Sequence, residues 1–428
     1  MKRTFRSFPV HDFLYTKWQM LSWANQFNIC CFLDDHSYNL PGHSFECMLA
    51  VNTTASLQTS CGNAYQQLHD FLDNNHDWCF GHLGYDLKNE TEAIYSRNPD
   101  HIQFPDLFFF VPEVVVILNT TELLIGVEQP QHQQIADAIM KMPVNTEQRS
   151  PSVDIKSRFS KAGYIATIEK LKEHIVRGDC YEINFCQEFY NEKVFIDPMH
   201  VYKSLSLESP NPFSSFYKLQ NKYLLCASPE RYLKKTGHTI ISQPIKGTLR
   251  RDNAAVQSDI MNKAVLRNSA KNRSENVMIV DLVRNDLSKI CTEGSVKVDE
   301  LFGIYSFPQL YQMISTISGE LKKDVSLADI FKATFPMGSM TGAPKKRVME
   351  LIEKYEQTKR GLFSGAIGYI SPEKDMDFNV VIRSVLYNAG TGYLSFQTGS
   401  AITYNSNPEE EYDECMLKAA AIKKVLNY

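Results

Sequence analysis

The sequence predicts an α+β fold built on large, largely antiparallel sheets. Segments rich in β-branched and aromatic residues and segments with a helical apolar period both occur, but they do not follow the strict strand–helix–strand order of a parallel sheet. Of the 428 residues, 43% are hydrophobic, so the chain can bury one or two large cores. No internal repeat or long low-complexity tract interrupts this pattern.

Charge and cysteine content argue against several classes of protein. The formal net charge is −4, whereas a nucleic-acid-binding protein needs a clustered basic face. The ten cysteines form no C-x-x-C pair, so we expect reduced, mostly buried thiols. The N-terminus lacks the apolar core of a signal peptide, and no run of 18 apolar residues occurs. The sequence therefore predicts a cytoplasmic protein without a membrane span or a nucleic-acid partner.

The chain is predicted to divide into an N-terminal region, residues 1–150, and a second domain, residues 151–428. Residues 141–157 between them are polar, contain two prolines and lack periodicity, which is typical of a linker. In the first region, the apolar run 108–118 predicts buried strands, and Pro112 indicates an edge or a bulge there.

The second domain carries clearer helix and strand signals. Ser160 is a predicted N-cap of a helix that ends near Arg177. Asn407 caps a helix that runs to residue 426, with Pro408 at its first position. The other predicted elements are a helix over 271–290 and strands over 180–190, 361–371, 380–388 and 392–402, the last ending in a Gly-Ser turn.

Carboxylates on two of these helices are candidate metal ligands. Glu411, Glu414 and Lys418 are spaced i, i+3, i+7 and share one helix face. This pattern fits a pair of carboxylates that binds a hard cation such as Mg²⁺. It equally fits acidic residues at a helix N-terminus with a Glu–Lys pair. Glu275 begins an apolar stripe on the helix 271–290, as a third ligand or as the rim of the core.

Two glycine-containing segments, 336–347 and 397–402, could bind an anion through backbone N–H groups. Neither has the spacing of a phosphate-binding loop. Arg383 lies among apolar residues of a predicted strand, where its guanidinium could grip a carboxylate or form a structural ion pair.

Taken in order, eight motifs resemble those of the chorismate-utilising enzymes, which include anthranilate, aminodeoxychorismate, isochorismate and salicylate synthases. The resemblance is strong over 158–426 and faint before it. It implies an anthranilate synthase component I-like fold, a sandwich of mostly antiparallel sheets with helices outside. The motifs are S-P-E-R (228–231), P-I-K-G-T (244–248), E-N-V-M-I-V-D-L-V-R-N-D (275–286), G-S-M-T-G-A-P-K (338–345), G-A-I-G-Y (365–369), I-R-S (382–384), Q-T-G-S-A (397–401) and E-E-Y-D-E (410–414).

Lys246 of P-I-K-G-T separates the branches of this family. Anthranilate synthases usually have alanine there, whereas lysine is typical of aminodeoxychorismate synthase component I. The resemblance implies that Lys246 attacks C2 of chorismate while the C4 hydroxyl leaves, and that ammonia then adds at C4 and expels the lysine. An amine attacks only when neutral, so we expect burial to lower the pKa of Lys246 in a turn. The alternative is an exposed turn lysine.

The resemblance also implies roles for the other motif residues. Glu230 would protonate the leaving hydroxide. Mg²⁺ would be held by Glu275 and Glu414, with Glu411 a direct or water-mediated ligand. The predicted substrate-binding residues are Thr248, Thr341, Gly342, Arg383, Gly399, Ser400 and Lys418.

Three positions and one segment depart from the family pattern. Gln312 stands where relatives often have histidine, Phe363 where many have tyrosine, and Asn272 where a carboxylate is common. The segment 32–37 (FLDDHS) is only a distant analogue of the N-terminal inhibitor-site signature, so tryptophan binding stays open.

The sequence contains no glutaminase nucleophile motif, so a separate glutamine amidotransferase is expected to supply ammonia. The alternatives are anthranilate synthase component I, which would release pyruvate; isochorismate or salicylate synthase, which would use water; and a silent subunit that only binds chorismate or the glutaminase.

Overall fold

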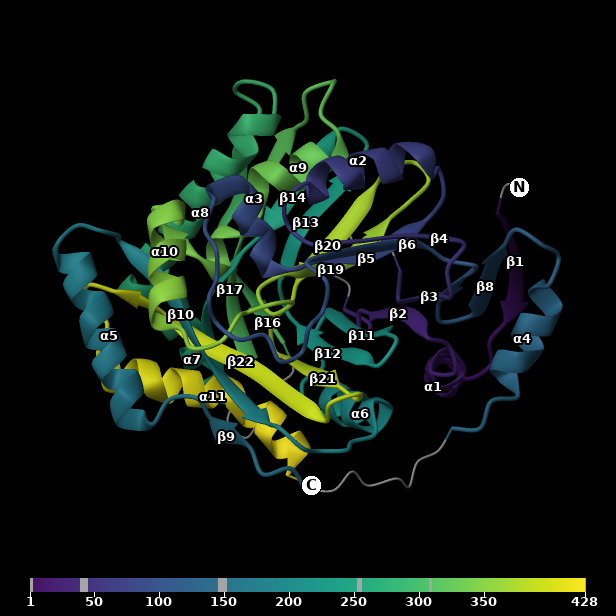
Figure 1. Ribbon diagram of the computed structural model, residues 1–428, viewed down its shortest axis with the longest axis horizontal. Coiled ribbons are helices and arrows are strands. Elements are labelled where there is room, and N and C mark those ends of the chain that lie inside the picture. Colours follow the sequence, from purple (N-terminus) through teal and green to yellow (C-terminus); the bar gives the residue numbers. More distant parts are fainter. Residues whose placement is uncertain (1–2, 39–44, 145–151, 252–255, 308–309, 428) are drawn as a thin grey trace.

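The computed structural model describes the chain except residues 1–2, 39–44, 145–151, 252–255, 308–309 and 428. Two antiparallel sheets lie face to face at its centre (Figure 1). The first has the order β1-β8-β7-β3-β2-β11-β12-β21-β22-β10-β18, with β9 paired to β10. Its strands are β1 (Thr4–Pro9), β2 (Ile29–Asp34), β3 (Cys47–Val51), β7 (Val114–Leu118), β8 (Glu122–Val127), β9 (Lys156–Ser157), β10 (Glu182–Asn191), β11 (Phe213–Leu219), β12 (Lys222–Ser228), β18 (Gly342–Ala343), β21 (Ser384–Asn388) and β22 (Tyr393–Thr403).

The second sheet has the order β15-β17-β14-β13-β20-β19-β5-β6-β4, with β16 paired to β17. Its strands are β4 (Ala55–Thr59), β5 (Cys79–Leu83), β6 (Leu107–Val111), β13 (Arg231–Thr236), β14 (Thr239–Gln243), β15 (Ile245–Arg250), β16 (Lys297–Ser306), β17 (Leu310–Glu320), β19 (Ala366–Ile370) and β20 (Met376–Val380).

Helices surround the two sheets (Figure 1). The α-helices are α1 (Phe13–Ala24), α2 (Ala64–Asn74), α3 (Lys88–Glu92), α4 (His132–Met140), α5 (Lys161–Val176), α6 (Pro198–Glu208), α7 (Val256–Asn268), α8 (Ala270–Ile290), α9 (Leu327–Thr334), α10 (Lys345–Tyr355) and α11 (Pro408–Leu426). Short 3₁₀ helices, η1 and η2, cover Tyr85–Leu87 and Gly338–Met340.

Each face of the first sheet packs into a different hydrophobic core. Alternate residues of a strand point to opposite faces, and in β2 Cys31 joins the core shared with the second sheet, whereas Cys30 and Phe32 join the core beneath the helices. Helices α1, α4, α5, α6 and α11 contribute to that outer core. The predicted α+β sandwich with helices outside is therefore confirmed.

The strongest helix predictions are also confirmed. The Ser160 side chain accepts a hydrogen bond from Gly163 N, and α5 buries the stripe that includes Tyr164 and Ile168. Asn407 caps α11 through the N–H groups of the next two residues after Pro408. Helix α8 covers the predicted segment 271–290 almost residue for residue.

Three strand predictions were wrong in detail. Pro112 lies neither at a sheet edge nor in a bulge, because it separates β6 from β7 in different sheets. The predicted strand 380–388 is likewise broken, with Arg383 in the left-handed region (φ 53°) between β20 and β21. Gly399 and Ser400 do not form a turn, since β22 continues through them to Thr403.

Strands from before and after residue 150 share both sheets. In the first sheet β2 pairs with β11, and in the second β5 pairs with β19. Neither sheet therefore divides at the predicted boundary near residue 150. Residues 145–151 of the predicted linker lie outside the described residues.

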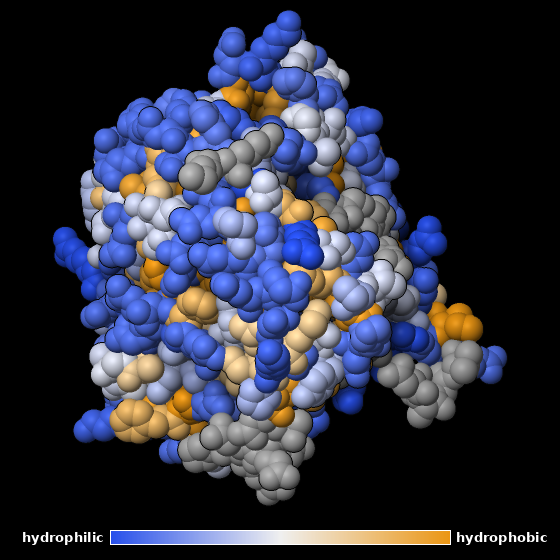
Figure 2. Space-filling model, turned by 90° about the vertical axis from the view of Figure 1, so that its right-hand side faces the viewer, coloured by the Kyte–Doolittle hydropathy of each residue, from blue (hydrophilic) through white to orange (hydrophobic). Residues whose placement is uncertain are grey.

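The ten cysteines are free thiols, and all but Cys61 are buried, as expected. Figure 2 shows the side with β1, β8 and α4, where apolar residues occur as separate spots on a largely hydrophilic surface. No helix in the described part of the chain has both the length and the apolar character needed to cross a bilayer.

Candidate active site

Lys246 projects from a bulge in strand β15. The register between β15 and β17 shifts between Ile245 and Thr248, and Gly247 within the shift has φ 97°, a conformation that favours glycine. A Cβ at Gly247 would also lie 3.1 Å from the side chain of Asn272 on α8. The bulge thus brings β15 close to α8 and buries Lys246, which is 9% exposed. The prediction of a turn was wrong.

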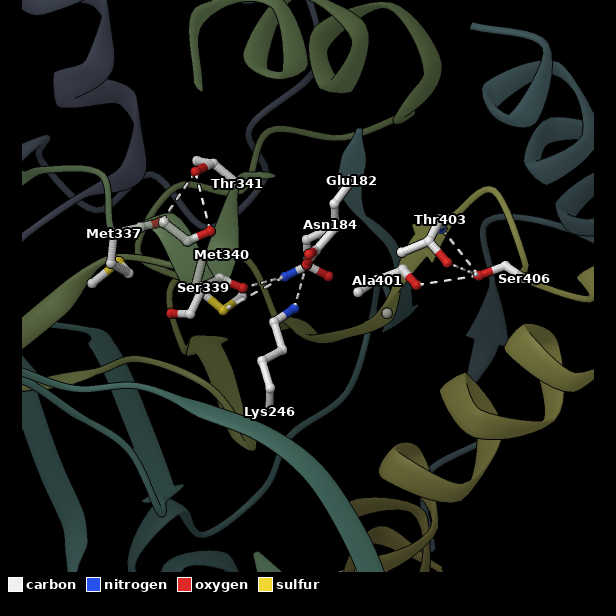
Figure 3. Close-up of polar contacts among 12 residues, drawn as sticks. Glu182, Asn184, Lys246, Met337, Ser339, Met340, Thr341, Ala401, Thr403 and Ser406 are labelled. Atoms are coloured by element: carbon white, nitrogen blue, oxygen red, sulfur yellow. Dashed lines mark hydrogen bonds and ion pairs between the residues drawn. The ribbon is translucent and has the colours of Figure 1, made fainter. Parts of the chain in front are cut away.

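The Lys246 ammonium donates to a carboxylate that the sequence did not single out. Nζ lies 2.8 Å from Oε1 of Glu182, the first residue of β10. Figure 3 shows the lysine reaching across to Glu182 and Asn184, with Ser339 and Met340 beside them. The strand CYEINFCQEFY also contains Glu188, so no local signal in the sequence singled out Glu182, which 64 residues separate from Lys246.

Gly342 permits the close approach of β18 to this carboxylate. It pairs with Ile183, next to Glu182, and a Cβ there would lie 2.1 Å from the Glu182 carbonyl oxygen. Thr341, which precedes it, is fully buried and donates its hydroxyl to Met337 O at 3.2 Å. In this structure both residues shape the wall of the site.

The pKa of Lys246 is raised, so the expectation that burial would lower it was wrong. Burial does favour the neutral amine, but the negative charges of Glu182, Glu275 and Glu230 together outweigh that effect. These carboxylates come from three separate elements, and only the folded chain brings them together. Attack by Lys246 therefore requires that its proton first move to another group.

Glu230 has the properties of a general acid. It follows β12 and is 4% exposed. Burial raises its pKa to about 7, although Ser339 and Lys246 both lower it. A carboxyl group with this pKa is partly protonated at neutral pH and can donate a proton to a leaving group.

The predicted metal ligands lie on α8 and α11. Glu275 on α8 is buried, and burial raises its pKa to about 7 even though Lys246 opposes this effect. Its Oε1 has no hydrogen-bond partner among the described residues. Glu411 accepts a hydrogen bond from Lys271 Nζ at 2.8 Å through Oε1. Its buried Oε2 has no partner among the described residues. Glu414 pairs with Lys418 at 2.8 Å.

These carboxylates suit Mg²⁺ by their chemistry, because hard cations prefer oxygen ligands. The buried, unpartnered oxygens of Glu275 and Glu411 provide such ligands. Lys271, whose pKa all three carboxylates raise against the effect of burial, supplies positive charge among them. Within the described ranges, however, no three acidic, histidine or cysteine side chains are close enough together to hold a metal ion.

Arg383 presents a guanidinium without a protein partner. It lies where the chain passes from β20 to β21, and its side chain forms no hydrogen bond or ion pair with the described residues. Burial lowers its pKa, although Glu414 opposes this effect. A desolvated guanidinium without a partner is costly, so this side chain is suited to bind an anion.

The remaining predicted substrate-binding residues are dispersed. Lys418 Nζ donates to Gly399 O at 2.8 Å, which joins α11 to β22. A Cβ at Gly399 would lie 2.0 Å from Phe185 O, so close strand pairing already requires this glycine. Ser400 Oγ is buried without a partner. Thr248 is exposed on β15, opposite Gln312.

Two of the departures from the family pattern, Gln312 and Asn272, lie beside strand β15. Gln312 is buried, and its Oε1 has no partner within the described chain. Asn272 packs against Gly247, beside the nucleophile candidate. Phe363 is buried in the core between the sheets.

The FLDDHS segment lies elsewhere, in the first sheet. Asp34 forms a buried ion pair with Lys17 at 2.9 Å. A small cavity of about 50 Å³, lined by Asp35, Phe45, Met48, Phe213 and Tyr369 among others, lies next to it. It is separate from the lysine and the carboxylates described above.

Comparison with known proteins identifies the family. The model of the family described as chorismate binding enzyme matches residues 18–424. Aminodeoxychorismate synthase component 1 of Bacillus subtilis is 30% identical over 84% of this chain and 78% of its own length. The Escherichia coli protein of the same name is 33% identical over 88% and 85%, respectively. The chain spans less than half of the chloroplastic aminodeoxychorismate synthases that it resembles, 43% of the one from Oryza sativa and 41% of the one from Arabidopsis thaliana.

The fold has counterparts among solved structures. Anthranilate synthase component I of Streptococcus pneumoniae superposes with a TM-score of 0.77 at 24% identity, over 90% of this chain and 94% of that one. Because the family model matches residues 18–424, this chain belongs to the chorismate-binding enzyme family.

Proposed function

We propose that the chain is aminodeoxychorismate synthase component I, a transferase that converts chorismate and ammonia to 4-amino-4-deoxychorismate for 4-aminobenzoate and folate synthesis. The observation that carries this proposal is the buried Lys246, whose amine lies among Glu182, Glu230 and Glu275. The two bacterial relatives compared above bear this name.

In the first step, Lys246 loses its proton and its Nζ forms a bond to C2 of chorismate. The two conjugated ring double bonds each shift by one bond, from C1=C2 to C1=C6 and from C5=C6 to C4=C5, and the C4–O bond breaks. Hydroxide is a poor leaving group, so Glu230 donates its proton and the oxygen leaves as water. The pKa of about 7 gives Glu230 the protonated form that this step needs.

In the second step, ammonia forms a bond to C4, both ring double bonds shift back, and the C2–N bond to Lys246 breaks. The Glu230 carboxylate, left by the first step, accepts the excess proton of the new amine. The enolpyruvyl group stays attached throughout. Splitting one substitution into two in this way is the general advantage of covalent catalysis.

Glu275, Glu411 and Glu414 would hold Mg²⁺. When bound, this ion supplies positive charge that offsets the ring carboxylate of chorismate. Lys271 would give up its contact with Glu411. The free guanidinium of Arg383 binds the enolpyruvyl carboxylate as a bidentate donor, and Lys418 balances the charge of Glu414. Thr248, Thr341, Gly342, Gly399 and Ser400 complete the proposed binding site.

Ammonia comes from a separate glutamine amidotransferase, because the sequence contains no glutaminase nucleophile motif. The free cysteines suit a reducing compartment such as the cytoplasm.

One assay separates this function from its alternatives. Purified chain is incubated with chorismate, Mg²⁺ and ammonium, and products are identified by mass. The proposal predicts 4-amino-4-deoxychorismate, no product from glutamine alone, and no pyruvate. Pyruvate with anthranilate would indicate anthranilate synthase, and turnover without ammonium would indicate a water-using isochorismate or salicylate synthase.

A further inference from the structure

We infer that Glu182 is the positioning residue that holds the Lys246 amine in place and receives its proton before attack. This inference rests on the proposed function, because it assigns the acceptor that a nucleophilic Lys246 requires. Glu182 belongs to none of the motifs by which the chain resembles its family.

The position of Glu182 beside Lys246 is the first support for this role. Glu182 is 1% exposed, and among the described residues its Oε1 is the hydrogen-bond partner of Lys246 Nζ, at 2.8 Å. Two pairings hold the backbone of Glu182. It faces Thr403 of β22 on one side and Ala343 of β18 on the other. The carboxylate is therefore presented to the amine from a backbone held within the sheet.

The second oxygen of Glu182 argues against a purely structural pair. Oε2 is buried and has no hydrogen-bond partner among the described residues. A stabilising buried ion pair normally has its remaining lone pairs satisfied. Glu188, further along β10, shows that arrangement, with Arg158 and Tyr393 donating to its two oxygens. Glu182 instead keeps an oxygen free.

The proton transfer balances without an outside reagent. The Lys246 ammonium gives one proton to the Glu182 carboxylate, which yields a neutral amine and a neutral carboxylic acid. After C2–N bond formation the nitrogen is positively charged. When the C2–N bond breaks in the second step, Lys246 leaves as the neutral amine and regains its proton from Glu182.

Other charged groups also face Lys246, so the test must isolate Glu182. They are Glu275 from α8, Glu230 from the segment between β12 and β13, and Glu414 from α11. The variants E182Q and E182D keep all three. E188Q is the matched control, because it removes another buried, ion-paired carboxylate from the same strand.

The direct readout needs no turnover. Each protein is labelled with acetic anhydride across a pH series without chorismate, and acetylation of Lys246 is followed by peptide mass spectrometry. Loss of the paired carboxylate should lower the labelling midpoint of Lys246 by about one to three pH units in E182Q. E182D should shift less, and E188Q should match the wild type.

The kinetic readout uses the same variants. E182Q should lose roughly 10²-fold in kcat with KM for chorismate within about twofold, because the acceptor touches the nucleophile and not the substrate. A Lys246 midpoint in E182Q equal to that of the wild type, or an unchanged kcat, overturns the inference. The free energy of unfolding of E182Q in urea should match that of E188Q, which excludes a folding defect as the cause of a lower kcat.

The two proposals fail in different ways. If the wild type forms no 4-amino-4-deoxychorismate, the proposed function fails, whatever the labelling shows. If the wild type forms that product and E182Q is unaltered, the function stands and the role of Glu182 is rejected.

Discussion

Two of the buried lysine–carboxylate pairs in the described part of the chain have nearly equal lengths but different surroundings. In the N-terminal region, Lys17 and Asp34 are 2.9 Å apart, and Asp34 also accepts from His36 N and Cys47 Sγ. In the candidate active site, Lys246 and Glu182 are 2.8 Å apart, yet Glu182 keeps a free oxygen and two more carboxylates act on the lysine.

This difference separates a satisfied ion pair from one prepared for chemistry. Asp35 as well as Asp34 raises the pKa of Lys17, but both oxygens of Asp34 accept hydrogen bonds, so moving the Lys17 proton gains nothing. Lys246, by contrast, is surrounded by more carboxyl groups than it can pair with. Burial raises the pKa of two of them, Glu230 and Glu275, to about 7. Small changes in the site can therefore move protons there. Mutations at the first pair should affect stability, and mutations at the second should affect turnover.

The largest effect is expected for K246A. Without the nucleophile, turnover should fall on the order of 10³-fold or more, as measured by product formation with ammonium. Because Lys246 lowers the pKa values of Glu230 and Glu275, its removal should raise both, and these acids should take up protons instead of staying charged. The variant should therefore still fold. If K246A turns over at the wild-type rate, Lys246 is not the nucleophile.

Glu230 should give the next largest effect. E230Q keeps the shape but cannot donate a proton, so kcat should fall roughly 10²- to 10⁴-fold. In the wild type, the step needs the protonated acid, so activity should decline as the pH rises through about 7. A pH–rate profile that is flat from pH 6 to 8 would contradict this role.

The same residue predicts a gain in stability. Burial raises the pKa of Glu230 from 4.5 to about 7, so the folded chain holds this proton more tightly than the unfolded chain. Its contribution to the free energy of unfolding therefore falls as the pH rises from about 4.5 to about 7. At pH 8, E230Q should be more stable than the wild type by up to about 3 kcal/mol, as measured by urea unfolding. At pH 4 the two should be alike.

Mg²⁺ should be required for turnover. Excess EDTA should abolish activity, and E414A or E411Q should weaken Mg²⁺ binding by about 10²-fold, as measured by calorimetry without substrate. Full activity in EDTA would reject the metal and, with it, the assignment of Glu275, Glu411 and Glu414.

The smallest effect on turnover is expected at the comparison pair. K17M leaves Asp34 buried without its cation, which should cost about 3–5 kcal/mol of unfolding free energy. The folded fraction should turn over at the wild-type rate, because Lys17 lies in the N-terminal region, outside the site. A specific loss of kcat in K17M would show that the two pairs do not differ as described.

Local signals in the sequence predicted much of this structure. Caps and apolar stripes located α5, α8 and α11, and ordered motifs predicted Lys246, Glu230 and the carboxylates of the site. The break at Arg383 was not predicted, because VVIRSVLYN has the composition of one strand. Glu182 and the raised pKa of Lys246 depend on residues far apart in the chain, so their effect arises only when β10, β15 and α8 meet.

The most direct test of the central claim is the intact mass of the wild-type protein, quenched after mixing with chorismate and Mg²⁺ in the absence of ammonium. If Lys246 is the nucleophile, a fraction of the protein should carry an adduct equal to chorismate less one water, and peptide mapping should place it on Lys246. K246A should carry none. Complete absence of the adduct from wild-type protein that makes 4-amino-4-deoxychorismate once ammonium is added would contradict the claim.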